Sequence, residues 1–207
     1  MGLEEYWSVR IIAITAVVFV LQMVFPWITN NFALNSAEAL GKPWEFVTHM
    51  FLHGGFEHIF YNMFALGLFG IILEKLIGGK RFMFIYFVGG VIAGIAAFLF
   101  YPSAIGASGA VFAIMGTLAV LRPKLTVFVF GIPMPMIVAS AVWIAIDIFG
   151  VFFPAGTANT AHLAGLFFGF IIGFLLRKQF GEPLFSEKGK QAFTDREFNR
   201  WENRWMH

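Results

Sequence analysis

The stretch from Phe82 to Leu121 reads FMFIYFVGGVIAGIAAFLFYPSAIGASGAVFAIMGTLAVL and contains no charged residue. A helix needs about 20 apolar residues to cross about 30 Å of hydrocarbon, so this stretch is too long for a single membrane span. The sequence from Tyr101 to Gly106, which contains both Pro and Gly, interrupts it. We therefore predict two consecutive spanning helices, at 82–101 and 107–121.

The composition of the whole chain also favours a membrane protein. Its 207 residues are 59% hydrophobic and 13% charged, whereas soluble domains average about 45–50% apolar and about 25% charged residues. A soluble fold could not bury so much apolar surface. Cysteine is absent, which excludes disulfide bridges, zinc–thiolate sites and a cysteine nucleophile. We expect one compact all-α membrane domain.

Charged residues and clusters of Gly and Pro divide the remaining sequence into further spans. The six predicted transmembrane helices are 11–28, 57–77, 82–101, 107–121, 133–153 and 160–176. Residues 29–56 are predicted to form a structured loop at the membrane interface. These segments make up a domain at 1–178. The polar tail at 179–207 is expected in the cytoplasm, either as an interfacial helix or as a solvated, frayed segment.

The positions of Lys and Arg predict the orientation, because cytoplasmic loops carry an excess of both. With six spans, only Lys42 falls on the outer side. We therefore expect both termini in the cytoplasm and an uncleaved N-terminal anchor. Helix ends account for the net charge of +2, so no nucleic-acid partner is expected. The basic residues on the inner side are Arg10, Lys75, Lys80, Arg81, Arg122, Lys124, Arg177 and Lys178.

Polar and ionisable groups inside a bilayer are costly and therefore suggest function. In the predicted topology such groups lie near the outer ends of three helices, where they can meet. They are His58 and Asn62, one turn apart in the second span, Gly106, Ser108 and Gly109 at the start of the fourth, and His162 at the start of the sixth.

Each of these signals has an ordinary structural interpretation when taken alone. A serine among glycines is often a helix N-cap, an intramembrane histidine often bonds a carbonyl, and the series Gly165, Gly169, Gly173 is a typical helix-packing face. The combination differs, because it supplies a nucleophile, a base and further donors at one depth.

The chemistry that fits this combination is acyl transfer. The Ser108 hydroxyl becomes a useful nucleophile only beside a base, which His162 would provide. The oxyanion would be held by His58, Asn62 and the backbone N–H of Ser108. No acid is evidently placed to orient His162, and the buried Asp147 is assigned no catalytic role. A Ser-His dyad without metal or cofactor is the simpler hypothesis.

The ordered set H-x-x-x-N (His58, Asn62), G-x-S-G (Gly106, Ser108, Gly109) and A-H-x-x-G (Ala161, His162, Gly165) resembles the rhomboid intramembrane protease family over nearly the whole chain. The resemblance implies a six-helix bundle, a Ser-His dyad, and cleavage of transmembrane protein substrates within the lipid bilayer near their outer ends. It also implies a multi-pass protein of a prokaryotic inner membrane.

The same resemblance assigns supporting residues and exposes departures. His53 falls where the family often has a histidine packed under the first loop, and Glu74 matches an acidic position that is more plausibly structural than catalytic. Many members carry Trp-Arg where this chain has Trp44-Glu45, and a tyrosine where it has Phe112, which could still stack on the catalytic histidine. Thr160 stands where glycine is common.

Other functions are less consistent with these residues. A small transporter predicts polar residues through the whole membrane depth and internal repeats, and neither is evident. A catalytically inactive rhomboid-like binding factor would have lost Ser108 or His162. A metalloprotease is disfavoured because no H-E-x-x-H occurs and because His49, His53 and His58 lack helical ligand spacing.

Overall fold

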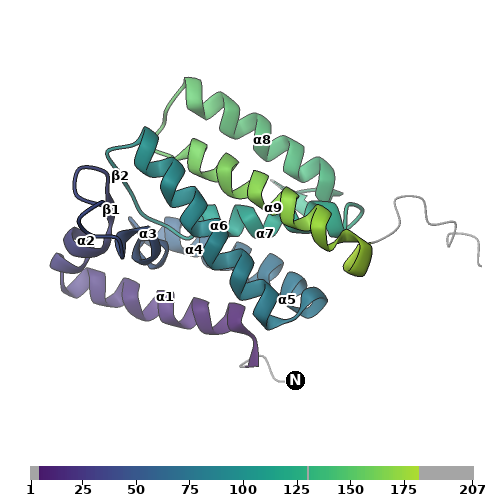
Figure 1. Cartoon of the computed structure of the whole chain (residues 1–207), viewed down its shortest axis with the longest axis horizontal. Coiled ribbons are helices and arrows are strands. Elements are labelled where there is room, and N and C mark those ends of the chain that lie inside the picture. Colours follow the sequence, from purple (N-terminus) through teal and green to yellow (C-terminus); the bar gives the residue numbers. More distant parts are fainter. Residues whose placement is uncertain (1–4, 130, 182–207) are drawn as a thin grey trace, which may run out of the picture.

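The computed structural model describes residues 5–129 and 131–181 as a bundle of helices (Figure 1). The prediction of an all-α bundle is confirmed, apart from two short pairs of strands. Helices long and apolar enough to cross a bilayer are α1 (Trp7–Val24), the continuous run Phe56–Ile77, α6 (Gly79–Phe100) and α9 (Asn159–Phe180). Two apolar helices are shorter, α7 (Ser108–Leu121) and α8 (Met136–Phe152).

Helix α7 forms the centre of the bundle. Every residue from Gly109 to Leu121 is buried, which explains why this helix is apolar on all sides rather than amphipathic. Helix α7 packs against both α6 and α9, which also pack against each other, and α8 lies beyond α9 (Figure 1). The residue at the start of α7, Ser108, is therefore held by helices that are themselves well packed.

Glycines on α9 allow it to approach α7 closely. A Cβ atom placed at Gly165 would collide with the carbonyl of Gly109, and one at Gly169 would collide with the carbonyl of Ala113. Thr117 Oγ1 donates a hydrogen bond of 3.1 Å to the Gly169 carbonyl across the same contact. The predicted helix-packing role of this glycine series is confirmed.

Helix α1 begins at Trp7, ahead of the predicted start at Ile11, because a carboxylate from another helix caps it. Glu74 lies on α5 (Ile71–Ile77), the last part of the run Phe56–Ile77, which also comprises α4 (Phe56–Ala65) and the π-helix η3 (Leu66–Gly70). Its two carboxylate oxygens accept hydrogen bonds from the backbone N–H groups of Trp7 and Ser8, at 2.8 and 2.9 Å. This contact satisfies amides that the helix itself leaves unpaired, so Glu74 has a structural role.

Helix α1 also ends earlier than predicted, at Val24, and a separate helix α2 (Trp27–Phe32) follows Pro26. The first loop then contains β1 (Leu34–Asn35), α3 (Glu45–Thr48) and the 3₁₀ helix η2 (His49–Phe51). Strand β1 pairs antiparallel with β2 (Ser103–Ala104), which lies just before α7. The first loop is thereby joined to the segment that carries Ser108.

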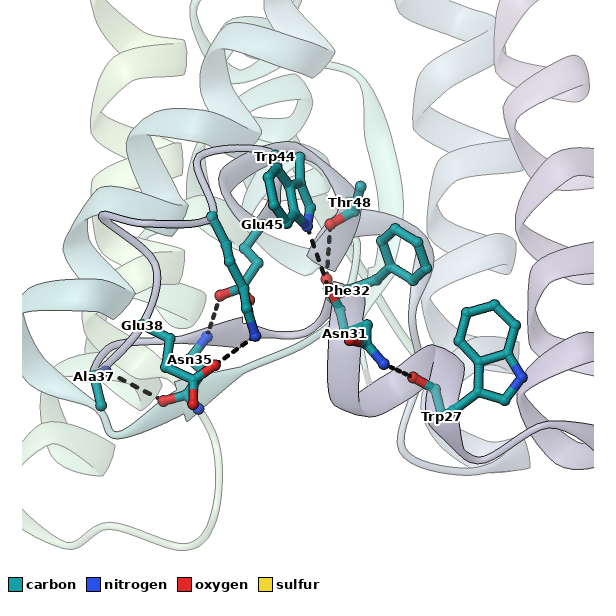
Figure 2. Close-up of polar contacts among 10 residues, drawn as sticks. Trp27, Asn31, Phe32, Asn35, Ala37, Glu38, Trp44, Glu45 and Thr48 are labelled. Carbon is teal, nitrogen blue, oxygen red and sulfur yellow. Dashed lines mark hydrogen bonds and ion pairs between the residues drawn. The ribbon is translucent and has the colours of Figure 1, made fainter.

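Figure 2 shows the contacts that Trp44 and Glu45 make in this loop, where many family members have Trp-Arg. The Trp44 indole N–H donates to the Asn31 carbonyl at 3.2 Å. The Glu45 side chain is fully buried, and its Oε2 accepts a hydrogen bond from the backbone N–H of Asn35 at 2.9 Å. Because Asn35 is in β1, Glu45 holds the strand that contacts β2. A buried carboxylate that organises the first loop therefore stands where many family members have arginine.

The fifth predicted span, 133–153, begins later than expected. Residues Thr126–Val129 (β3) and Ile132–Pro135 (β4) form an antiparallel pair, and α8 starts at Met136. Neither Pro133 nor Pro135 has the N–H group that a helix interior requires, so the helix cannot include them. Pro135 is acceptable in its actual position, directly before the first residue of α8. Helix α9 continues to Phe180, past the predicted Leu176. Residues 182–207, which hold the tail predicted as either an interfacial helix or a frayed segment, lie outside the described residues.

The described chain begins and ends at the same end of the bundle. The first residues of α1 and the last residues of α9 point toward the same end of the bundle, with α5 between them, whereas α2, α3, β1 and β2 gather at the opposite end (Figure 1). The residues predicted to carry the chemistry lie toward that second end, because Ser108 follows β2 directly in the chain.

Candidate active site

The backbone before Ser108 makes a turn that only glycine adopts easily. Gly106 has φ of +123°, and its N–H donates to the His49 carbonyl at 2.9 Å. A Cβ atom at Gly106 would lie 2.8 Å from Nε2 of His58 and 3.9 Å from Oγ of Ser108. Glycine at this position therefore provides the conformation of the turn and leaves room for His58 beside the serine.

Ser108 and His162 are in direct contact. The Ser108 Oγ lies 2.8 Å from Nε2 of His162, which is the distance of a good hydrogen bond. The imidazole stacks on Phe112, with ring centroids 4.3 Å apart and an interplanar angle of 13°. Phe112 also makes a T-shaped contact with Trp143 on α8, with ring centroids 5.9 Å apart. The predicted stacking by Phe112 is therefore present.

The helices around this pair approach closely because small residues face one another. A Cβ atom at Gly109 would collide with the Ala93 side chain of α6. Since Gly165 faces the Gly109 carbonyl from the other side, Gly109 is in close contact with two helices. A larger residue at position 109 would push Ser108 away from His162.

The structure corrects the expectation that no acid orients His162. Asp147 on α8 is 2% exposed, and its Oδ1 lies 3.0 Å from Nδ1 of His162. The same oxygen accepts a hydrogen bond of 2.8 Å from Nδ2 of Asn159. The sequence carried a signal for this contact, since an acid within a membrane span is a functional candidate by default. Asn159 was missed altogether.

His58 presents a donor next to the serine loop. The backbone N–H of Gly54 donates to Nδ1 of His58 at 3.3 Å. In a neutral imidazole the other nitrogen, Nε2, then carries the proton, and Nε2 is the atom that lies beside Gly106. Asn62 donates one amide N–H to the His58 backbone carbonyl at 2.9 Å. Its second N–H is the one left for other partners.

An open cavity of about 560 Å³ adjoins these two side chains. Its lining is mixed in polarity and comes from the start of α4 and the two glycines before it. Ser108 and His162 are not among the described residues that line it. The lining residues are Gly54, Gly55, Phe56, Glu57, His58, Tyr61 and Asn62.

His53 and His49 lie beneath the site rather than in it. His53 is buried, packs edge-on against His58 with centroids 5.0 Å apart, and receives a long hydrogen bond of 3.5 Å from the Ala107 amide. Burial lowers the pKa of His53 to about 4, and the nearby His58 acts in the same direction. Burial also lowers the pKa of His49 to about 4. Both side chains are therefore neutral at neutral pH and support the loop as packed rings.

Comparison with known proteins places this geometry in a family. Residues 40–179 match the Rhomboid domain, which is more than half of the chain. The chain belongs to the rhomboid family. Every candidate residue from His53 to His162 lies inside the matched segment, and the apolar helices of this rhomboid make it an integral membrane protein.

Named relatives give the same family. The chain is 33% identical to Rhomboid protease GluP of Bacillus subtilis over 77% of this chain and 30% of the relative. It is 29% identical to Rhomboid protease GlpG of Haemophilus influenzae over 64% of this chain and 69% of the relative. It is 36% identical to RHOMBOID-like protein 6, mitochondrial, of Arabidopsis thaliana over 67% of this chain and 45% of the relative. This rhomboid therefore spans less than half the length of GluP and of the plant relative.

Proposed function

We propose that this chain is an intramembrane serine endopeptidase in which Ser108 is the nucleophile and His162 the general base. The observation that carries the proposal is the 2.8 Å contact between Ser108 Oγ and His162 Nε2. Relatives named as rhomboid proteases support the same activity. The reaction is hydrolysis of a peptide bond and requires no cofactor or metal.

His162 Nε2 first accepts a proton from Ser108 and later donates it to the leaving group. His162 Nε2 takes the Ser108 proton while Oγ attacks the carbonyl carbon of the substrate. When the tetrahedral intermediate collapses, the carbon–nitrogen bond breaks and the same Nε2–H donates its proton to the leaving amine. A water molecule then repeats the sequence on the acyl-enzyme, which releases the second product and restores the serine.

The oxyanion formed in both steps needs fixed donors. Ser108 lies in the first turn of α7, where backbone N–H groups have no carbonyl partner within the helix and the helix dipole favours negative charge. The Nε2–H of His58 lies next to Gly106, the residue two positions before Ser108. We propose these groups, together with the free N–H of Asn62, as the oxyanion site.

Helix lengths and charges support a particular membrane setting. We propose six spans, with α7 and α8 as the shorter ones, and both termini in the cytoplasm of a prokaryotic cell. Helix α7 has 14 residues and extends about 21 Å, against about 30 Å of hydrocarbon. With its last residue at the cytoplasmic interface, Ser108 lies below the outer boundary of the membrane. The open cavity beside His58 supports entry of water from that side.

The substrates that fit this setting are transmembrane proteins. A peptide bond in a helix is shielded by hydrogen bonds and side chains, so the segment must unwind before Ser108 reaches its carbonyl carbon. Unwinding is easiest where Gly, Pro or small polar residues weaken the helix. We propose cleavage at the outer end of a substrate span, after a small residue.

The test combines covalent labelling with cleavage. Purified protein in detergent is treated with a fluorophosphonate probe and separately with a single-span substrate, and Ser108→Ala and His162→Ala serve as comparisons. We expect label on Ser108 of the unmodified protein alone, and no cleavage by either variant. Full turnover by Ser108→Ala would overturn the assignment. Substrate binding without labelling or cleavage by the unmodified protein would make it a non-proteolytic binding factor.

A further inference from the structure

His162 makes contacts through both ring nitrogens, and the second contact belongs to an acid. While Nε2 faces Ser108, Nδ1 lies 3.0 Å from Oδ1 of Asp147. Resting on the proposed serine protease function, we propose that Asp147 is a positioning residue that makes this site a Ser-His-Asp arrangement rather than a dyad. It holds the imidazole in the one protonation state that can accept the proton of Ser108.

The argument begins with the proton count of the ring. A neutral imidazole carries one N–H donor and one acceptor nitrogen. A carboxylate oxygen only accepts, so Nδ1 must carry the proton in order to bond Asp147. Nε2 is then the acceptor, which is what a general base beside Ser108 requires. Without Asp147, the proton could lie on Nε2 instead, and the ring could not take the serine proton.

The carboxylate is itself held in place by α9. Asn159, the first residue of α9, is 5% exposed. Its side-chain Nδ2 donates a hydrogen bond of 2.8 Å to the same Oδ1 of Asp147. Gly150 follows Asp147 by three residues on α8, and a Cβ atom there would collide with the Asn159 amide. The missing side chain at Gly150 therefore makes room for Asn159. The acid, the amide and the imidazole form a compact contact between α8 and α9.

The burial of the acid bears on how it acts on the imidazolium that forms during the reaction. Asp147 Oδ2 is buried and has no hydrogen-bond partner in the described part of the chain. In a low-dielectric interior, a carboxylate interacts strongly with a cation that forms beside it. The imidazolium of His162, formed when it takes the Ser108 proton, is that cation. A purely structural link to Asn159 would be served equally well by an uncharged amide.

The ring of His162 is consequently fixed on three sides. Ser108 and Asp147 bond its two nitrogens, and Phe112 covers its face. Two hydrogen bonds and one stacking contact restrict rotation of the imidazole about its side-chain torsions. This preorganisation lowers the cost of reaching the geometry for attack.

The decisive variant is Asp147→Asn, which keeps the shape and can keep the contact with Asn159 but removes the charge. We expect kcat for a single-span substrate to fall by roughly 10²–10⁴-fold with little change in KM, because the imidazolium exists only during the reaction. The rate of labelling by a fluorophosphonate should fall in parallel. Asp147→Glu, which restores the charge, should recover part of the loss.

Ser140→Ala is the matched control. Ser140 lies two turns before Asp147 on α8, is fully buried, and donates a hydrogen bond to the Met136 carbonyl of its own helix. Its replacement should leave kcat unchanged. Rates are expressed per folded molecule, from thermal unfolding of each variant in the same detergent, so that a loss of folded protein does not count as a loss of catalysis.

A spectroscopic readout does not depend on activity. The unmodified full chain should show a strongly downfield proton NMR resonance from the imidazole Nδ1–H, absent in His162→Ala and shifted in Asp147→Asn. Equal labelling rates and kcat for Asp147→Asn and the unmodified protein, or no such resonance, would overturn the proposal while leaving the Ser108 assignment standing. Failure of the unmodified protein to label at Ser108 would instead contradict the proposed function.

Discussion

The imidazole of His162 lies nearly parallel to the ring of Phe112, with centroids 4.3 Å apart. Phe112→Tyr should keep this stacking and retain kcat within about threefold. Phe112→Ala removes a contact worth about 0.5–1.5 kcal/mol, so kcat should fall by up to about tenfold if the stacking mainly orients the base. Steady-state cleavage kinetics measure both variants.

Exposed Phe128 on β3 provides the comparison, because Phe128→Ala removes a ring far from the site and should leave kcat unchanged. An equal loss in Phe112→Tyr and Phe112→Ala would contradict a role for the stacking, because the tyrosine ring keeps it.

The sequence could predict features that depend on the order and length of the helices. It could not predict contacts that depend on how one helix is rotated against another. The hydrophobic spans decide which helix ends share a side of the membrane, so Ser108, His162 and His58 could be brought together from the sequence. The contact of Asp147 with His162 depends on how α8 is rotated against α9, and the spacing of residues does not reveal that rotation. For the same reason, the sequence exposed Glu45 as a departure but not its bond to Asn35.

The glycine face of α9 gives a prediction about stability. Gly169→Ala places a Cβ atom against the Ala113 carbonyl, so it should lower the free energy of unfolding by about 1–3 kcal/mol through overpacking. Gly67→Ala is the matched control. A Cβ atom there meets only Ile12 Cδ1 at 3.6 Å, an ordinary contact, and the better helix propensity of alanine should make the change neutral or stabilising.

Unfolding of both glycine variants in detergent is followed by circular dichroism. If the two variants had the same stability, the close approach of α7 and α9 would not depend on Gly169.

The buried histidines of the first loop give a prediction about pH. The pKa of His49 and of His53 is lowered from 6.5 to about 4 by burial, so the unfolded chain binds protons that the folded chain does not. Stability is therefore full above about pH 6.5 and is lost progressively as pH falls toward 4, by on the order of 3 kcal/mol for each histidine. Thermal unfolding measured between pH 7.5 and pH 4 follows this loss.

The variant His53→Gln keeps a polar side chain of similar size but cannot titrate. Its unfolding temperature should depend less steeply on pH than that of the unmodified protein, whatever its stability at pH 7.5. Parallel curves for the two proteins would mean that His53 does not contribute to acid sensitivity.

The proposed oxyanion donors should differ in their effects. His58 Nε2–H lies beside Gly106 and the serine, so His58→Ala should lower kcat by about 10²–10³-fold with little change in KM. Asn62 has one amide N–H engaged by the His58 carbonyl and only the other available, so Asn62→Ala should lower kcat by less.

Tyr61→Phe is the control, because Tyr61 lines the same cavity but is not a proposed donor. It should keep normal kcat. A change in KM alone for His58→Ala and Asn62→Ala would reassign both residues to substrate binding, since a donor to the oxyanion acts mainly on charge that develops during the reaction.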